Sequence, residues 1–265
     1  MIVAMAEDAL ETPDPIALRA SLAPGEAVLE GDFTLSIAGE AVAFHVEAPG
    51  GPTTLEALLP VFQGLSNEVA RRAAAKVIAD GQTISCRAGC GACCRQAVPV
   101  AEAEARRLAA LVEAMPEPRR SEIRARFEAA ERRLEETTLA SQMVDMPDGK
   151  TVIDVGTKYF GLGVACPFLE AESCSIHPDR PLRCREYFVT SPAPACAAMV
   201  VGTIHKVPLA GVPSSALYAA GAEHTPQGWL LLTNALSFAE RFPQSSPARP
   251  APEWMAEVVG RLARK

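Results

Sequence analysis

Aromatic residues are scarce in this sequence: Phe, Trp and Tyr together make up 5% of its 265 residues. A core built from it must pack mainly Ala, Leu and Val, and metal crosslinks would be a useful supplement to such a core. The chain still has enough apolar material to fold, because 49% of its residues are hydrophobic and 22% are charged. This balance is typical of a globular protein, and the length allows one large domain or two small ones.

Basic residues are outnumbered by acidic ones, with 25 Lys and Arg against 32 Asp and Glu, so the formal net charge is -7. Phosphate contacts need clustered Lys and Arg, so we expect no nucleic-acid partner. No apolar run approaches the roughly 20 residues of a membrane-spanning helix, so we expect no membrane insertion. The sequence starts at Met1 without the basic region of a secretory signal, and we expect a cytoplasmic protein. In that reducing compartment its eight cysteines are not expected to form disulfides.

Local patterns predict an α+β fold, predominantly helical, with a metal-pinned cysteine-cluster domain and a small N-terminal β-hairpin. Alternating apolar and polar residues at 32–37 and 41–46, separated by a turn at Gly39, predict the hairpin. We divide the chain into an N-terminal subdomain with this hairpin and helices (1–80), a cysteine-cluster metal-binding domain (81–200) and a helical tail that packs on it (201–265).

Capping residues and apolar periodicity predict the helices. Thr53 or Thr54 caps a first helix towards Leu59, and Ser66 caps a second one that ends before Gly81. The remaining predictions are an irregular arm with one short helix at 1–31, helices at 101–114 and 119–138, a turn at 148–149, a strand at 151–155, a buried helix at 229–238, and a short last helix after the Pro-rich stretch 243–252.

The first group of cysteines has the spacing C-x3-C-x2-C-C, and it consists of Cys86, Cys90, Cys93 and Cys94. Glycines at 89 and 91 allow the backbone to fold tightly around an ion. Three sulfurs on so short a loop can bind one centre at low cost in chain entropy. We expect the neighbouring side chains of Cys93 and Cys94 to diverge, so that one of them serves a second metal or stays free.

The second group is spread over a longer segment, and it consists of Cys166, Cys174, Cys184 and Cys196. Pro167, Pro178 and Pro181 stiffen this segment and reduce the ordering cost of binding. All eight cysteines are candidate metal ligands. They suffice for two sites with four ligands each, or for one site and spare cysteines.

Arginines gather beside both groups of cysteines, at positions 87, 95, 180, 183 and 185. Thiolate is the form that binds metal, and a nearby cation lowers the pKa of a cysteine towards that form. The same cations would offset the negative charge of a tetrathiolate centre. The alternative is that these are ordinary surface arginines.

All-sulfur ligation suits zinc and iron–sulfur clusters alike. Zinc fingers commonly pair their ligands as C-x2-C on two knuckles, whereas this chain has C-x3-C-x2-C-C, which favours an iron–sulfur cluster of the 4Fe–4S type over zinc. The C-x3-C-x2-C spacing is also that of radical S-adenosylmethionine enzymes. The repeated strand–helix alternation of their barrel does not follow here, so we do not expect that fold.

The two groups together resemble the YkgJ-type cysteine-cluster family. The resemblance rests on Cys86-x3-Cys90-x2-Cys93-Cys94, on Cys166-Pro-Phe-Leu, and on Cys174-Ser-Ile-His-Pro-Asp-Arg-Pro-Leu-Arg-Cys184-Arg. That family is described as zinc- or iron-chelating and includes relatives of flagellin lysine N-methylase. The resemblance implies metal binding by the first seven cysteines, and Cys196 lies outside its strong local patterns.

Three functions are compatible with these residues. The first is iron–sulfur redox or transfer chemistry that modifies a protein side chain, as in an oxidoreductase or an N-methylase-like enzyme. No catalytic residue is assigned, although Tyr159, Tyr187 and His177 lie near cysteines and could act as acid–base groups. The second is a structural zinc module that organises a surface for a protein partner. The third is a thiol redox sensor, which requires Cys94 or Cys196 to be free and exposed.

Overall fold

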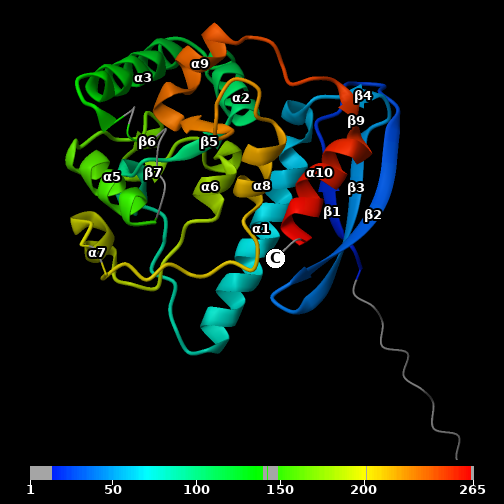
Figure 1. Cartoon of the computed structure of the whole chain (residues 1–265), viewed down its shortest axis with the longest axis horizontal. Coiled ribbons are helices and arrows are strands. Elements are labelled where there is room, and N and C mark those ends of the chain that lie inside the picture. Colours follow the sequence, from blue (N-terminus) through cyan, green and yellow to red (C-terminus); the bar gives the residue numbers. More distant parts are fainter. Residues whose placement is uncertain (1–13, 140–141, 143–148, 201, 264–265) are drawn as a thin grey trace, which may run out of the picture.

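The computed structural model describes residues 14–139, 142, 149–200 and 202–263. The fold is α+β and predominantly helical, as predicted. Three strands at the N-terminal end form a sheet in the order β1-β3-β2, shown in blue in Figure 1. They are β1 (Ile16–Arg19), β2 (Val28–Ile37) and β3 (Glu40–Pro49).

The predicted hairpin is confirmed. β2 and β3 pair antiparallel with Ile37 opposite Glu40, and Ala38 and Gly39 between them have positive φ angles of 56° and 89°. A two-residue turn with this backbone matches the twist of the paired strands. The expectation of an irregular arm is wrong for its described part, which contains β1 and the start of β2. Residues 1–13 of that arm lie outside the described residues.

One long helix, α1 (Leu55–Ala79), follows the sheet. Thr54 is its N-cap as predicted, because the Thr54 Oγ1 accepts a hydrogen bond from Ala57 N (3.4 Å). Ser66 does not start a second helix; it is fully buried inside α1 and its hydroxyl donates to Glu186 (3.4 Å). The helix runs on because apolar residues recur every three or four positions on its buried side, at Leu58, Leu59, Phe62, Leu65, Val69 and Ala73.

The first core lies between the sheet and α1, where Phe44 and Phe62 are completely buried. The last helix, α10 (Ala251–Ala263), confirms the predicted C-terminal helix and joins this core through Trp254. Figure 1 shows it in red beside α1. Trp254 Nε1 donates to Thr53 O (3.1 Å). Also here are α8 (Pro213–Ala220) and the two short paired strands β4 (Pro52–Thr53) and β9 (Arg249–Pro250).

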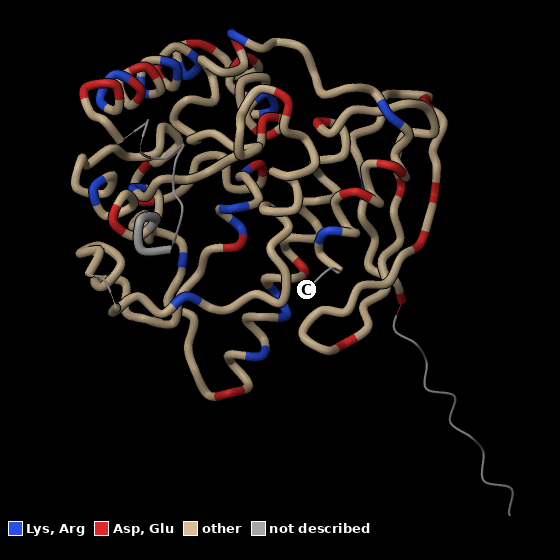
Figure 2. The backbone as a smooth tube through the Cα atoms, viewed as in Figure 1, with Lys and Arg blue, Asp and Glu red and all other residues tan. Residues whose placement is uncertain are grey.

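A second core holds the helical half of the molecule together, with Val100, Leu108, Ile123, Phe127 and Phe168 at its centre. Figure 2 shows basic and acidic positions alternating along α3, the helix at the upper left, which agrees with a solvated charged face. The elements of this half are β5 (Pro99–Ala101), α2 (Glu102–Glu113), α3 (Arg119–Glu135), α5 (Gly149–Gly161), β8 (Trp229–Leu231), the 3-10 helix η3 (Leu232–Asn234) and α9 (Ala235–Arg241).

The helices predicted at 101–114 and 119–138 are confirmed as α2 and α3, and two other predictions here are wrong. Residues 151–155 belong to helix α5, in which Val155 and Tyr159 lie one turn apart and are both buried. Residues 229–238 do not form one helix, because Trp229–Leu231 pairs with β5 as strand β8 and the chain then turns through η3 into α9. Part of the turn predicted at 148–149 lies outside the described residues.

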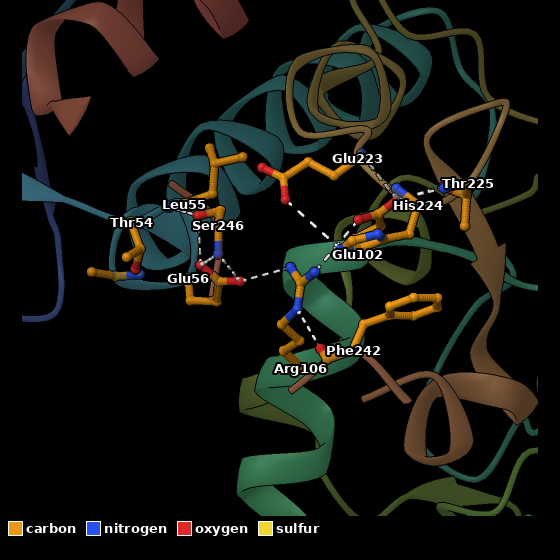
Figure 3. Close-up of polar contacts among 11 residues, drawn as sticks. Thr54, Leu55, Glu56, Glu102, Arg106, Glu223, His224, Thr225, Phe242 and Ser246 are labelled. Carbon is orange, nitrogen blue, oxygen red and sulfur yellow. Dashed lines mark hydrogen bonds and ion pairs between the residues drawn. The ribbon is translucent and has the colours of Figure 1, made fainter. Parts of the chain in front are cut away.

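A buried ionic network joins the two halves (Figure 3). The Arg106 guanidinium contacts Glu56 Oε1 (3.1 Å) and Glu102 Oε2 (3.5 Å), and its Nε donates to Phe242 O (3.1 Å). Glu102 Oε1 in turn accepts the backbone N–H groups of residues 223–225 at 2.8–3.2 Å. Because this carboxylate is almost fully buried, these donors replace the water that it loses.

Among the described residues, no helix is both long enough and apolar enough to cross a membrane. The division of the chain into three parts at residues 80 and 200 stays a prediction. Residues 201–265 contribute side chains to both cores.

Candidate metal centre

The loop that follows α1 carries the first two cysteines, Cys86 and Cys90. Ser85 fixes its start against the segment after Cys184: Ser85 N donates to Val189 O (2.9 Å) and its Oγ donates to Thr190 O (3.1 Å). The start of the first cysteine group is thus hydrogen-bonded to a segment about a hundred residues further along the chain.

The two glycines of this loop serve different purposes: Gly89 has a positive φ angle, and Gly91 lies in close contact with the second cysteine segment. Gly89 has a φ of +80°, and its N donates to Ser173 Oγ (3.2 Å). A Cβ on Gly91 would lie 2.7 Å from Leu169 Cδ1 and 2.7 Å from Glu172 Oε2. Real Cβ atoms do not approach other atoms so closely, so the absence of a side chain at Gly91 lets the first loop pack against the second segment.

Cys93 and Cys94 lie on the short 3-10 helix η1 (Ala92–Arg95). Their thiols are close enough for Cys94 to be the main cause of the raised pKa of Cys93, so the expected divergence of these two side chains is not observed. Cys94 O accepts a hydrogen bond from Cys166 N (2.7 Å). This backbone contact joins the two cysteine groups directly, across 72 positions of sequence that contain α2, α3 and α5.

An ion pair reinforces the same junction. Both terminal nitrogens of Arg95 contact the Glu172 carboxylate, at 2.9 and 2.6 Å, and Arg95 Nη1 also donates to Gly91 O (3.0 Å). A two-point arginine–carboxylate contact fixes orientation as well as distance. One of the predicted arginines therefore serves to hold the two cysteine segments together.

The cysteines of the second segment are carried by short elements. Cys174 lies in the hairpin β6 (Leu169–Glu170) and β7 (Ser173–Cys174), and Cys166 precedes it. Cys184 lies on α6 (Leu182–Arg185), which the short 3-10 helix η2 (His177–Asp179) precedes, and Cys196 lies on α7 (Ala193–Ala198). Figure 1 shows β6, β7, α5, α6 and α7 in the same half of the molecule.

Hydrogen bonds from other parts of the chain hold α6 in position. Leu182 N donates to Glu104 Oε1 of α2 (2.7 Å). The buried Arg185 donates to Arg180 O (2.9 Å), to Asn67 Oδ1 of α1 (3.1 Å) and to Pro178 O. Cys184 is thus placed by the long helices and not by its own four-residue helix.

One cavity of about 1350 Å³ unites these elements. Its walls include every cysteine of the protein: Cys86, Cys90, Cys93, Cys94, Cys166, Cys174, Cys184 and Cys196. The thiols surround this space without sharing one ion position, because no three His, Cys, Asp or Glu side chains of the described residues have the arrangement of an ion site. The chemistry of the donor set fits a thiophilic metal, and ligation by each cysteine stays a prediction.

Comparison with known protein families adds a finding on the same segment. Residues 85–198 match the family CxxCxxCC, "Putative zinc- or iron-chelating domain". This segment is similar to that cysteine-cluster family. The resemblance predicted from the sequence is confirmed, and the matched segment, which covers less than half of the chain, supports metal binding through cysteines. Neither a curated protein nor a solved structure matches the chain.

Burial is the main cause of the shifted pKa values of five cysteines in this segment. It raises the pKa of Cys166 to about 12, and it raises the pKa of Cys184 well above the ordinary value of a thiol. Burial is also the main cause of the raised pKa values of Cys86, Cys174 and Cys196. These thiols are therefore protonated near neutral pH, and a metal that binds them must displace their protons.

The predicted influence of the arginines is confirmed for Arg180, whose charge acts to lower the pKa values of Cys93 and Cys174. For both thiols this effect is smaller than the effects that raise the pKa, so the net shift is opposite to the one expected from the sequence. The Arg180 Nε is buried and has no hydrogen-bond partner among the described residues. A negative charge in the cavity would therefore compensate this side chain.

The three candidate acid–base residues differ in their access to the cavity. Tyr187 and His177 line it, and Gln96 Nε2 donates to the Tyr187 hydroxyl (3.2 Å). Tyr159 does not line it and is buried, which raises its pKa to about 12. The requirement of a redox sensor is not met by Cys196, which is only 4% exposed.

Sequence reasoning missed several residues that shape this site. Lys206 comes from the segment after α7 and lies over the Tyr187 ring, 5.1 Å from its centroid. Glu104 and Glu172 support the cysteine segments through hydrogen bonds. Glu104 was foreseeable, because its carboxylate accepts Ala101 N (2.8 Å) at the start of α2, a common position for a capping glutamate. No local pattern marks Lys206.

Proposed function

We propose that the cavity holds an iron–sulfur cluster of the 4Fe–4S type, bound through thiolates of the CxxCxxCC domain. The observation that supports this most strongly is the meeting of two cysteine segments, distant in sequence, around one cavity. The C-x3-C-x2-C spacing of Cys86, Cys90 and Cys93 favours a cluster, since it places three thiols on one short loop. Each thiol that binds loses its proton to solvent.

The cavity also supports a reaction at this site. At about 1350 Å³ it exceeds the roughly 300–1000 Å³ of common ligand pockets, so a cluster would leave space beside it. When bound, such a cluster supplies redox chemistry. Tyr187 and His177 lie on the wall and could move a proton to or from a bound group. We propose redox or transfer chemistry on a protein side chain, in the cytoplasm, where thiols stay reduced.

A structural zinc module that organises a protein-interaction surface is the competing function. All-thiolate sites with four ligands are common for zinc, and such a site would be closed. Anaerobic purification followed by elemental analysis and a visible spectrum separates the two. Iron with brown colour, visible absorption and bleaching on reduction is expected. Colourless protein with tightly held zinc would replace the cluster by the zinc module, and protein without either metal would refute metal binding.

The variant Cys90→Ser tests ligation at one position. We expect lower metal content and lower stability together, because site formation and folding are coupled. Ala88→Ser is the matched control, since it places a hydroxyl on an exposed residue of the same loop. Metal content equal to that of the unmodified protein in Cys90→Ser would remove Cys90 from the proposed ligands.

A further inference from the structure

The wall of the cavity is basic, although acidic residues outnumber basic ones in the protein as a whole. Among the described residues, Glu172 is the one carboxylate that lines it, and Glu172 is already paired with Arg95. The basic side chains on the wall are Arg71, Arg87, Arg180, Arg183, Arg185 and Lys206. A space with such an excess of positive charge favours a negatively charged occupant.

Four of these six cations already have a role in the chain. Arg71 makes two hydrogen bonds with Glu68, at 2.7 and 2.6 Å. Arg185 holds α6 in position through its hydrogen bonds. Arg87 and Arg180 belong to the cysteine segments, where their charges would offset those of metal-bound thiolates. The other two cations are therefore the ones available to a ligand.

Arg183 is the first of these two, and it lies on α6, which packs against α8 (Figure 1). Its Nη1 is 3.9 Å from Glu186 Oε2, an oxygen that already accepts Ser214 Oγ at 2.5 Å. The other oxygen of this carboxylate accepts Ser214 N (2.8 Å) and Ser66 Oγ (3.4 Å). Because closer donors occupy Glu186, the guanidinium of Arg183, which is 40% exposed, keeps donors for a ligand.

Lys206 is the second, and it reaches the cavity from the segment that follows α7. Its backbone pairs with Val189, and its Nζ lies over the Tyr187 ring, 5.1 Å from the centroid. Apart from this ring, the ammonium group has no hydrogen bond or ion pair within the described part of the chain. Partial burial and the nearby charge of Arg183 both lower the pKa of Lys206. Two positive charges thus lie close together, an arrangement that a bound carboxylate would stabilise.

A buried acceptor on the cavity wall favours a peptide as the source of this carboxylate. Gln227 Oε1 is buried and accepts no hydrogen bond from the described residues. Its position is fixed by the next residue, because a Cβ on Gly228 would overlap Tyr218 O of α8. A simple carboxylate ion has no donor for Gln227 Oε1, whereas the N–H groups of a peptide can satisfy it.

We propose that the protein substrate of this site presents an acidic residue, whose carboxylate is bound by Arg183 and Lys206. The proposal rests on the proposed chemistry on a protein side chain, and it names the kind of segment that enters the cavity. Hydrogen bonds from two cations to one carboxylate are charge-assisted and strong. A carboxylate that binds Lys206 lies beside the Tyr187 ring and so holds the substrate at a candidate acid–base residue.

The test is the binding of two labelled peptides to the full-length protein, purified without air and followed by fluorescence anisotropy. One peptide is Gly-Ser-Glu-Ala-Glu-Ser-Gly, and in the other Gln replaces both Glu residues. We expect the acidic peptide to bind about tenfold more tightly, and this preference to shrink at high salt. Equal binding of the two peptides, or binding of neither, overturns the proposal. The metal content of the same sample decides the proposed function separately.

Free glutamate, added in the same assay, separates a protein segment from a small compound. We expect it not to displace the acidic peptide at equal concentration, because it lacks the backbone on either side of the acidic residue. Displacement at equal concentration would overturn the protein segment as the occupant.

Variants of the two cations test their role. Lys206→Met and Arg183→Met are each expected to weaken binding of the acidic peptide about tenfold, and Lys206→Arg to keep it. Arg241→Met is the matched control, since Arg241 also lies over an aromatic ring, that of Phe242 (5.9 Å), but does not line the cavity. Unchanged affinity in Lys206→Met overturns the proposal. So does a loss of metal in Lys206→Met that Arg241→Met does not show, because this cation would then serve the metal centre. The comparison of the two peptides on the unmodified protein stands even if Arg183→Met does not fold.

Discussion

Glu104 offers a test of how the helical scaffold supports the cysteines. Its side chain is 2% exposed and accepts two backbone hydrogen bonds, from Ala101 N (2.8 Å) and from Leu182 N (2.7 Å), at the start of the helix that carries Cys184. Burial raises the pKa of this carboxyl to about 7, and the nearby Glu186 adds to the shift. The substitution Glu104→Gln keeps the shape of the side chain and removes its titration.

The size of the effect follows from the two pKa values. An unfolded glutamate has a pKa near 4.5 and the folded one about 7, so the folded state binds an extra proton between these values. The contribution of Glu104 is therefore most favourable below about pH 4.5 and is lost as the pH rises to about 7. At 1.36 kcal/mol per pKa unit, the loss is about 3 kcal/mol. The Glu104→Gln variant does not titrate and therefore has no such pH-dependent loss of stability. It replaces one carboxylate oxygen by an NH2 group that cannot accept a hydrogen bond, which lowers the free energy of unfolding by about 1 kcal/mol at every pH.

The assay is urea unfolding, followed by circular dichroism, of both proteins in the same reduced, metal-free state at several pH values from about 5 to about 8. Other titrating groups, including the cysteines, contribute equally to both proteins, so the difference isolates Glu104. We expect the variant to have the lower free energy of unfolding near pH 5. Towards pH 8, the difference in free energy of unfolding should change in favour of the variant by about 2–3 kcal/mol. A constant difference across this range would refute the raised pKa.

Three further outcomes are expected. Glu102→Ala should lower the free energy of unfolding by about 3–5 kcal/mol in denaturant titrations, because it leaves the buried Arg106 and the N–H groups of residues 223–225 without their partner. A decrease below about 1 kcal/mol would contradict a stabilising role of this ionic network. Gly91→Ala should lower the free energy of unfolding by about 1–3 kcal/mol and reduce the metal content. Gly156→Ala, at a position on α5 with open space around it, should raise the free energy of unfolding by up to about 1 kcal/mol. Chelation of the metal should speed proteolysis within residues 82–200, and equal cleavage rates with and without metal would argue against coupling between the site and the fold.

Local sequence was sufficient where one residue type dictates one backbone. The turn at Gly39 and the cap at Thr54 were predicted correctly, because positive φ angles and side-chain caps depend on immediate neighbours. The strand predicted at 151–155 was wrong for the opposite reason. Its β-branched residues favour a strand locally, but Val155 and Tyr159 gain burial against Leu134 only when the segment is helical.

For the site, the sequence alone determined the donor chemistry: eight thiols in two groups, with glycines in the first and prolines in the second, and a resemblance to a cysteine-cluster family. Tertiary structure decided that all eight line one cavity, with Cys196 beside Cys90 and with burial outweighing the charge of Arg180. Spacing along the chain fixes only how far apart two cysteines can be. Their actual separation depends on contacts such as Cys94 O with Cys166 N and Glu104 with Leu182 N, which form only when the long helices pack.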